Sequence, residues 1–409
     1  MRPKSSSAYG RQRRLGFPGR LRSPHERSGV RVMTDTTERV ETLIIGGGQA
    51  GLAAGYHLSK RGMPFQILDA DERIGDHWRE RWDSLRLYSP ARSDGLPGMP
   101  FPLPAYAYPN GRQMGDYLAA YAARFHLPVR SGVRVDGLRP AGGGRSGYVV
   151  TDGDRRWEAN QVVVATGAFQ RPKVPDFASQ LDPRIRQLHS SEYRSPSQLQ
   201  PGPVLVVGVS HSGADIAFET AATHPTILSG RAHGQLPFAV IDTWRARIVW
   251  PIVAFAAAHL LTIRTPIGRK LGPELRKGGG PLLRVRLPDL DRAGVDRREA
   301  RTVGVVDGKP KLADEQVLDI ANVIWCTGFQ QDYDWIDLPD VVGDDGWPRE
   351  ARGVAPAAGL YFLGIPFTYA FTSMLVAGAG RDAAYVVDRI AERARTATRA
   401  AVLAPAEAR

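Results

Sequence analysis

Two glycine-rich stretches carry the clearest chemical signal in this sequence. The first follows a β-rich run, Val40–Ile45, and reads Gly46-Gly47-Gly48-Gln49-Ala50-Gly51 before a run of small, helix-forming residues. Gly46 permits a tight turn, Gly48 keeps side chains away from an approaching pyrophosphate, and Gly51 lets the helix approach the strand. Because the amino end of the helix presents unpaired N–H groups, this stretch predicts a dinucleotide site.

An acidic residue follows at the position that completes such a site. A second β-rich run, Pro64–Leu68, ends at Asp69, eighteen residues after Gly51. A carboxylate at this point accepts hydrogen bonds from a ribose hydroxyl. The order of strand, glycine loop, helix, strand and acid therefore predicts that the first site binds FAD.

The pattern recurs in the middle of the chain. The run Val204–Val207 leads into Gly208-Val209-Ser210-His211-Ser212-Gly213 and a helix. Gly208, Ser212 and Gly213 keep the loop pattern, while Ser210 replaces the middle glycine, which makes the backbone less open but adds a hydroxyl that can donate to a phosphate. After another β-rich run, Thr226–Leu228, Arg231 lies eighteen residues beyond Gly213. An arginine there binds a 2′-phosphate, so the second site predicts NADPH; a solvated surface charge is the alternative for Arg231.

Opposite charges at matching positions of two sites indicate a hydride passing between two bound cofactors, FAD and NADPH. Chemistry of this kind needs geometry and electrostatics from the protein rather than a nucleophile, and the sequence contains no catalytic triad and no metal-binding motif. The predicted fold is α/β, with two Rossmann-like dinucleotide-binding domains, the NADPH domain being inserted into a split FAD domain.

From about Thr42 to Ile390 the chain resembles the flavin-containing monooxygenases, most closely their YUCCA-like and bacterial branch. Besides the two loops, the resemblance is carried by Gly75-Asp76-His77-Trp78, Arg81-Trp82-Asp83-Ser84-Leu85, Ala165-Thr166-Gly167, His189-Ser190-Ser191-Glu192-Tyr193, Cys326-Thr327-Gly328-Phe329 and Gly359-Leu360-Tyr361-Phe362-Leu363-Gly364. It implies that Trp78 lies at a cofactor and that Thr166 and Thr327 mark passages of the chain between the two nucleotide domains. Cys326, inside one passage, is then a small buried apolar residue rather than a catalytic thiol.

The resemblance also implies a role for a helix near the carboxyl terminus. Gly380 and Asp382 precede an amphipathic run, Ala383–Ala391, which we expect to form this helix. Its amino end would lie beneath the flavin and stabilise negative charge there. Asp382 also has an ordinary alternative interpretation, as an acid at a helix amino end.

Some positions depart from the family pattern. Pro183 and Ile185 stand where the family's identifying stretch has an aromatic residue and a glycine, and that stretch ends in Tyr193-Arg194 instead of the Trp-Pro of Baeyer–Villiger relatives. The ending favours heteroatom-oxygenating or YUCCA-like enzymes. The segment Tyr88–Asp94 has no counterpart of the Asn beside the flavin in animal-type members. His189 either steadies the linker near NADPH or is a structural histidine.

The leading hypothesis is an NADPH-dependent FAD monooxygenase. Through a C4a-hydroperoxyflavin it would pass one oxygen of O₂ to a small nucleophilic nitrogen or sulfur compound or to a keto acid. One alternative is a flavin oxidase or reductase that produces peroxide, and another is a non-catalytic redox-sensing or nucleic-acid-binding flavoprotein. A thioredoxin-reductase-like enzyme is excluded, because the chain has one cysteine. The sequence names neither the substrate nor the oligomeric state.

The 409 residues suggest two or three domains. We expect a basic extension at 1–32, the first FAD part at 33–170, the NADPH domain at 171–317 and the second FAD part at 318–409. The extension carries nine basic residues and one acid, so it holds +8 of the net charge of +12, and it is predicted to be disordered. A nucleic-acid or membrane arm and a targeting peptide are alternatives to an upstream-extended reading frame, which we favour, so no nucleic-acid partner is predicted.

The NADPH domain contains an apolar insertion at 245–290. Within it, residues 248–263 are mostly apolar and lie between arginines, but they include Pro251 and His259. About 20 apolar residues are needed to span a bilayer, so a buried or interfacial helix is favoured over a span. The predicted location is the cytoplasm, and contact of 248–263 with a membrane surface stays open.

Overall fold

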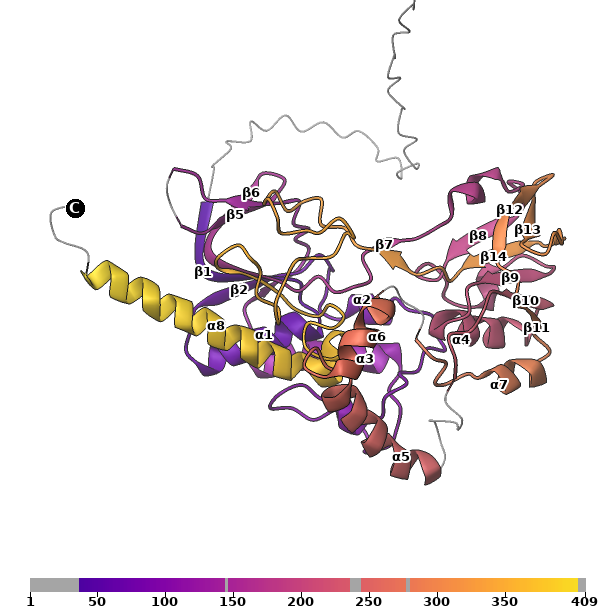
Figure 1. The fold of residues 1–409 in the computed structure, drawn as a ribbon, viewed down its shortest axis with the longest axis horizontal. Helices are drawn as coiled ribbons and strands as arrows, with labels where there is room; N and C mark the ends of the chain where they lie inside the picture. The colour runs from indigo at the N-terminus through magenta and orange to yellow at the C-terminus, as the bar shows by residue number, and fades with distance from the viewer. Residues whose placement is uncertain (1–36, 144–145, 236–243, 277–279, 404–409) are drawn as a thin grey trace, which may run out of the picture. The chain divides into compact units, whose positions relative to one another are not determined.

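The strand before the first glycine loop lies in the middle of a mixed sheet. The computed structural model describes residues 37–143, 146–235, 244–276 and 280–403, so the predicted disorder of 1–32 lies outside the described residues. The strand order is β3-β2-β1-β6-β5-β4, and β16 pairs with β6. Figure 1 labels β1, β2, β5 and β6 of this sheet. Pairing is parallel except for β4–β5 and β5–β6. The strands are β1 (Thr37–Ile45), β2 (Phe65–Leu68), β3 (Val129–Arg130), β4 (Gly137–Pro140), β5 (Tyr148–Asp152), β6 (Arg155–Val164) and β16 (Leu360–Phe362).

Apolar runs make these central strands possible, because both faces of the sheet are covered. In β1 and β6, residues 43–45 and 162–164 are at most 4% exposed. One face packs on α1, α3 and α8, and the other on the β4–β5 ribbon and residues 333–342. Near-continuous apolar strands are typical of parallel sheets covered on both sides. The helices of this part are α1 (Gln49–Lys60), α2 (Asp76–Arg79), the 3₁₀ turn η1 (Ala91–Ser93), α3 (Gly111–Arg124), the 3₁₀ turn η5 (Phe371–Met374) and α8 (Val376–Leu403).

The second glycine loop follows a strand of a separate, wholly parallel sheet. Its order is β11-β10-β9-β14-β8. The strands are β8 (Arg186–His189), β9 (Val204–Val207), β10 (Thr226–Ser229), β11 (Asp296–Arg298) and β14 (Asn322–Trp325), with helices α4 (His211–Thr220) and α7 (Leu287–Arg292), the 3₁₀ turns η2 (Asp176–Gln180) and η3 (Pro196–Gln198), and the hairpin β12 (Thr302–Val306) and β13 (Lys309–Leu312).

The pairing of β14 corrects one predicted boundary. The division at 317/318 would group Asn322–Trp325 with the first sheet, but β14 pairs with β9 and β8 of the second sheet. The chain returns to the first sheet only after Trp325. Local sequence could not reveal this, because an apolar strand fits either sheet. The other predicted domain limits stay predictions, and by its contacts Thr36–Arg409 forms one compact unit.

The two connections between the sheets run beside each other. β7 (Arg171–Pro172) follows the first sheet's β6, β15 (Phe329–Gln330) follows the second sheet's β14, and the two short strands pair antiparallel. Lys173 N–H donates to Gly328 O at 3.0 Å, and the Thr327 hydroxyl donates to Lys173 O. The Thr-Gly segments thus bring the crossing chains into one place.

The apolar insertion forms helices rather than a span. α5 (Trp244–Phe255) contains Pro251, continues into a π-helical turn, η4 (Ala256–Leu260), and is followed by α6 (Pro266–Arg276). Across the described residues, no helix is long and apolar enough to cross a membrane.

The carboxyl-terminal helix is longer than predicted. We expected a helix over Ala383–Ala391, but α8 begins at Val376 and ends at Leu403. Gly380 and Asp382 therefore lie inside its first two turns instead of before it. We did not predict this start because its residues are small, which is typical of a loop. Close packing explains the glycine at 380, since a Cβ there would lie 2.5 Å from Pro97 Cγ.

Candidate functional site

The first glycine loop divides into positions closed by the protein's own backbone and one position that is open. A Cβ on Gly46 would lie 2.4 Å from Ala165 O, and one on Gly51 would lie 1.9 Å from Gly46 O. Gly46 also has φ +112°, which side chains rarely adopt. At Gly48 a Cβ would meet only the His77 ring, at 3.7 Å or more. The space at Gly48 thus fits a ligand, as predicted for a pyrophosphate.

The amino end of α1 leaves its backbone donors available. Gly48 is the N-cap residue and makes no side-chain capping bond, and the first turn carries no acid. The first N–H groups of a helix have no partner within the helix and attract anions. The loop and the helix end together make a fitting cradle for a dinucleotide phosphate.

Asp69 lies directly after β2 and is bound to the loop. Its Oδ2 accepts from Gly47 N–H, and its Oδ1 accepts from Asp71 N–H at 2.8 Å. The side chain is 7% exposed, and burial raises the pKa of Asp69 above its usual value. Each carboxylate oxygen can accept a second hydrogen bond, so the predicted ribose contact remains available. Asp69 also holds the loop in shape, a role that the sequence did not reveal.

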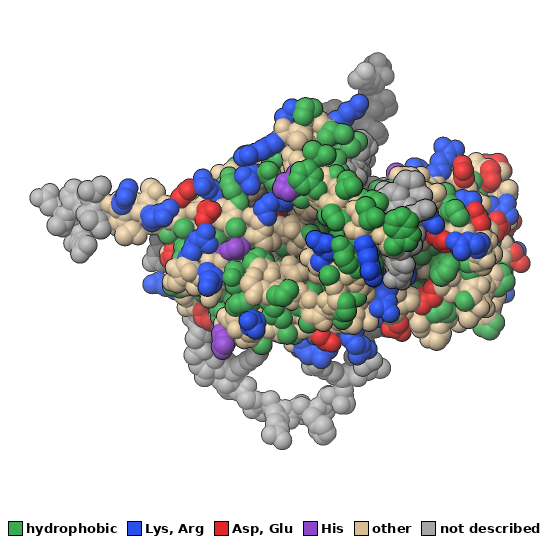
Figure 2. Space-filling view, turned by 90° about the horizontal axis from the view of Figure 1, so that it is seen from below, with side chains coloured by type: hydrophobic (Ala, Val, Ile, Leu, Met, Phe, Trp, Pro, Cys, Tyr) green, Lys and Arg blue, Asp and Glu red, His purple; other side chains and the backbone are tan. Residues whose placement is uncertain are grey.

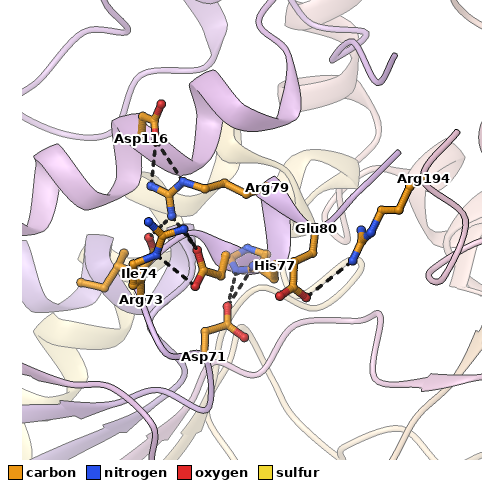
Figure 3. A network of polar contacts seen from close by, with 9 residues as sticks. Asp71, Arg73, Ile74, His77, Arg79, Glu80, Asp116 and Arg194 are labelled. Carbon is orange, nitrogen blue, oxygen red and sulfur yellow. Dashed lines mark hydrogen bonds and ion pairs between the residues drawn. The ribbon is translucent and has the colours of Figure 1, made fainter. Parts of the chain in front are cut away.

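A polar network follows Asp69 and fixes the segment that carries Trp78 (Figure 3). Asp71 accepts from the backbone N–H of His77 at 3.0 Å and contacts its ring Nδ1 at 3.2 Å, and the bond to this ring lowers the pKa of Asp71. Arg79 bridges Asp76 and Asp116, each at 2.9 Å. Trp78 Nε1 is buried and has no hydrogen-bond partner among the described residues. Such an orphaned donor fits the predicted cofactor contact of Trp78.

The second loop repeats the backbone plan of the first. A Cβ on Gly208 would lie 2.4 Å from Cys326 O, and one on Gly213 would lie 1.8 Å from Gly208 O. Ser210 is the N-cap residue of α4, and its side chain makes no capping bond. Ser210 and Ser212 are both half-buried at this helix end. They lie at the amino end of a helix, a position where proteins commonly bind phosphates, so their contact with a phosphate stays a prediction.

Arg231 is not the structural counterpart of Asp69, despite the equal spacing. Gly46 N–H donates to Leu68 O, and Gly208 N–H donates to Ser229 O, so the residue that matches Asp69 is Gly230. Arg231 lies one residue further along. The count misleads because α4 is two residues shorter than α1, while the connection from α4 to its next strand (221–225) is one residue longer than that from α1 (61–64).

Arg231 nevertheless borders a cavity of about 480 Å³ at the ends of β10 and β11. Its side chain is 79% exposed, and its nearest acid, Glu299, is 4.0 Å away and equally exposed. Such a pair contributes little. Two further arginines line this cavity, Arg297 and Arg298, each held by a nearby aspartate. We had not predicted these two, and only the pairing of β10 with β11 brings them beside Arg231.

The passages between the sheets position side chains near both loops. The Thr166 hydroxyl accepts from the Gln170 side chain at 3.0 Å. His189 is 2% exposed, and its Nε2 contacts Gly328 O at 3.0 Å while its Nδ1 contacts the Ser191 hydroxyl at 2.8 Å. Burial lowers the pKa of His189. Both ring nitrogens are satisfied within the protein, which favours the structural interpretation of this histidine.

The segment Tyr88–Asp94 contains functional candidates that we had not predicted. Tyr88 stacks on His211 of the second loop, with ring centroids 4.9 Å apart. Asp94 is 1% exposed, its Oδ1 accepts from the Ser89 hydroxyl at 2.6 Å, and its Oδ2 has no partner among the described residues. Burial raises the pKa of Asp94 to about 7. The segment thus brings Tyr88 against the second loop and buries a carboxyl whose pKa is raised; no local pattern marks it.

Near the start of α8, Asp382 is satisfied within the protein. It is 6% exposed, accepts from Arg381 Nε at 2.8 Å and accepts from the Thr368 hydroxyl at 3.2 Å. The Gly380 carbonyl lies 3.1 Å from His57 Nε2. Both residues brace the helix, and its free amino end lies further back, at Val376.

The structure therefore places ten of the fourteen predicted site residues in two clusters, which do not include Thr166, Thr327, Gly380 and Asp382. The first cluster contains Gly46, Gly48, Gly51, Asp69 and Trp78, and the second contains Gly208, Ser210, Ser212, Gly213 and Arg231. Among the described residues no group of His, Cys, Asp and Glu could hold a metal ion.

Comparison with known proteins shows which family the chain belongs to. A model of the pyridine nucleotide-disulphide oxidoreductase family matches residues 43–232. An uncharacterized CzcO-like oxidoreductase of Geobacillus kaustophilus is 38% identical, covering 86% of this chain and 98% of that protein. The probable indole-3-pyruvate monooxygenase YUCCA3 of Arabidopsis thaliana is 29% identical, covering 86% of both. A solved flavin-containing monooxygenase from Stenotrophomonas maltophilia is 27% identical, with TM-score 0.69 over 87% of this chain and 99% of its own. The chain belongs to the flavin-containing monooxygenase family.

As a flavin-containing monooxygenase family member, the protein is an oxidoreductase with the predicted α/β, Rossmann-like architecture. The predicted cofactors, FAD and NADPH, agree with this family. The matching domain model is named for disulphide chemistry, but the sole cysteine, Cys326, is buried and burial raises the pKa of its thiol. This family member therefore has no redox pair of its own.

Proposed function

We propose that the protein is an NADPH-dependent FAD monooxygenase that transfers one oxygen atom of O₂ to a small substrate with a nucleophilic nitrogen or sulfur, or to a keto acid. The observation that carries this proposal is the pair of glycine loops with opposite surroundings. Asp69 is bound to the first loop, and an arginine-lined cavity adjoins the second. Two nucleotide sites of opposite charge suit a hydride donor and its acceptor.

In this proposal the first loop holds FAD. Gly48 leaves room for the pyrophosphate, the N–H groups of α1 bind it, and Asp69 accepts from the ribose. Trp78 Nε1 supplies a further donor. Bound FAD supplies the redox chemistry, accepting a hydride from NADPH and passing electrons to O₂.

The second loop holds NADPH. Ser210 and Ser212 donate to its phosphates at the amino end of α4, and Arg231 pairs with the 2′-phosphate, with Arg297 and Arg298 adding positive charge. Asp94, on the segment whose Tyr88 stacks on His211 of the second loop, is the proton source in this proposal. A carboxyl with a pKa near 7 is matched to proton transfer at neutral pH.

A flavin oxidase that releases peroxide is the second candidate. It is favoured by the segment Tyr88–Asp94, which has Asp94 and no Asn in the region that resembles the animal-type members. A non-catalytic redox sensor would bind both cofactors without turnover.

Product analysis under turnover tests the proposal. The purified full chain is supplied with NADPH and O₂, and a thioether, a tertiary amine or an arylpyruvate is added in separate runs. We expect one of these substrates to lower the peroxide yield and to appear as an oxygenated product in an amount equal to the NADPH consumed. Peroxide equal to NADPH with every substrate would overturn oxygenation in favour of the oxidase. Absence of NADPH consumption in a flavin-loaded sample would favour the sensor.

A further inference from the structure

The helices of the insertion expose an apolar face to solvent, which we call the α5–α6 face. It comprises Ile248, Ile252 and Phe255 of α5, Leu260 of η4, and Ile267 and Leu271 of α6. The exposed fractions of these side chains range from 39% to 65%. On α5 the three residues follow one another by four and three positions, which puts them on one side of the helix. Contiguous exposed apolar surface of this kind marks a contact site.

The opposite side of α5 is attached to the body of the protein, so the orientation of the face is fixed. Trp250 is 9% exposed, and its Nε1 donates to the Ser93 hydroxyl at 2.9 Å. After η4, Leu261 O accepts from Phe371 N–H and Ile263 N–H donates to Tyr369 O, each at 2.9 Å. The apolar side chains therefore cannot turn inward without breaking these contacts.

The charge around the face is mostly positive. From Trp244 to Arg276, the end of α6, the sequence contains six basic residues and one acidic residue, Glu274. The side chains of Arg247, Arg264, Arg269 and Lys270 are exposed. Figure 2 views the molecule from the side where α5 lies in Figure 1. On this side of the molecule, hydrophobic and basic side chains gather over the middle, and most acidic side chains lie toward the two ends. Two copies of this face would bring cations together, which disfavours self-association.

We propose that the α5–α6 face docks on the surface of a bilayer that contains anionic phospholipids. α5 has twelve residues and η4 has five, too few to span the hydrocarbon core, and only one side of them is apolar and exposed. An apolar stripe flanked by Arg and Lys lies in the plane of the membrane interface, with the side chains in the acyl boundary and the cations at the phosphates. The inference does not depend on the reaction that the protein catalyses.

Vesicle co-sedimentation of the full chain tests the proposal. The probes are vesicles of phosphatidylcholine alone and of phosphatidylcholine mixed with phosphatidylglycerol. We expect the double variant Ile252→Glu, Phe255→Glu to lower partition onto the mixed vesicles by roughly tenfold or more, because two charges enter the apolar contact. The matched control is Val303→Glu, Val317→Glu, which changes two apolar residues that are 50% and 44% exposed on another part of the molecule. The basic segment 1–32 is present in every variant, so any difference reports on the face.

A second variant tests the contribution of the basic side chains separately from that of the apolar ones. Arg264→Gln, Arg269→Gln, Lys270→Gln should weaken the preference for phosphatidylglycerol over phosphatidylcholine relative to the unmodified chain, which keeps the same basic segment 1–32, and added salt should weaken the binding of the unmodified chain. Unchanged flavin content and melting temperature establish that each variant is folded. Equal partition of the unmodified chain, the double variant and the control would overturn the proposal. So would a change in sedimentation mass of the double variant with no change in vesicle binding, since the face would then be a protein interface.

Discussion

The two glycine loops share a backbone plan and differ at the positions that this plan leaves free. In both, the first glycine lies against the carbonyl of a passage residue, and the third glycine lies against the carbonyl of the first. The distances to an added Cβ agree within 0.1 Å: 2.4 and 2.4 Å, then 1.9 and 1.8 Å. The middle position, in contrast, is Gly48 in one loop and Ser210 in the other. The chain's own backbone requires glycine at the shared positions, and it leaves the middle position open.

The two regions also differ in how a buried carboxyl in each is compensated. Asp215 of α4 is 6% exposed and pairs with Arg284 at 2.9 Å. Asp94, in the half of the chain that forms the first sheet, has only the Ser89 hydroxyl. A nearby cation stabilises the ionised form of a buried carboxyl, and the carboxylate stabilises the cation. A buried carboxyl without such a partner is more stable in its protonated form. The second region therefore pairs its buried acid with an arginine, whereas the buried acid of the first region has no charged partner among the described residues and a raised pKa.

The largest expected effect comes from filling a position closed by backbone. Gly51→Ala should prevent folding or destabilise the protein by about 3 kcal/mol or more, because the new Cβ would overlap Gly46 O at 1.9 Å. Ordinarily Gly→Ala within a helix is stabilising by roughly 1 kcal/mol. Soluble yield and thermal melting measure the effect. The control Gly304→Ala, which would meet nothing within 4 Å, should melt like the parent; a normally folded Gly51→Ala would break the comparison.

The next effect separates ligand space from backbone space. Gly48→Val should yield folded protein without FAD, because the added side chain fits beside His77 but occupies the room kept for the pyrophosphate. Released flavin per mole of protein and circular dichroism are the measurements. Ser210→Val is the matched change in the other loop, and it should keep its flavin while binding NADPH more weakly. A flavin-loaded Gly48→Val would refute the assignment of the first loop.

Coenzyme preference sharpens the chemical difference between the sites. Arg231→Ala should raise KM for NADPH by roughly 10- to 150-fold, which corresponds to losing a charged hydrogen bond of about 1.5–3 kcal/mol. NADH kinetics and the flavin spectrum should stay unchanged. Arg184→Ala removes an equally exposed arginine elsewhere and serves as the control. If the NADPH to NADH ratio of kcat/KM does not move, Arg231 is a surface charge and the cavity's other arginines carry the preference.

The smallest effect concerns pH and the two buried acids. Burial raises the pKa of Asp94 to about 7 from an ordinary value near 4, so between these pH values the folded protein holds a proton that the unfolded chain has released. Stability from this group therefore falls as pH rises from about 4 to about 7. Relative to Asp94→Asn, the parent should lose a few degrees of melting temperature across that window.

Asp215→Asn supplies the contrast. Burial raises the pKa of Asp215 to about 6, although Arg284 acts to lower it. The contribution of Asp215 to stability therefore stops changing with pH above about 6. This variant should be destabilised at neutral pH, because Arg284 is left without its partner.

The prediction for Asp94 would be contradicted if the melting temperatures of the parent and of Asp94→Asn changed in parallel with pH. Asp94 would then be ionised throughout this pH range and hold no proton near neutral pH.

The sequence by itself determined the elements and the loops. Val204–Val207 was predicted with the bounds that β9 has, and the strands before and after each glycine loop were found to within a few residues. These features depend on local rules: apolar runs form buried strands, and a glycine is required where a backbone carbonyl leaves no room for a Cβ. Such rules can be read from neighbouring residues alone.

Only the tertiary structure decided which segments meet. It placed β14 in the second sheet, the start of α8 at Val376 and Arg297 beside Arg231, and it buried Asp94. Each outcome depends on contacts between residues far apart in the chain, which no local pattern encodes. The count of eighteen residues put Arg231 in the place of Asp69 because the helix and the connection after each loop differ in length, and the backbone bonds of Gly46 and Gly208 show which residues correspond.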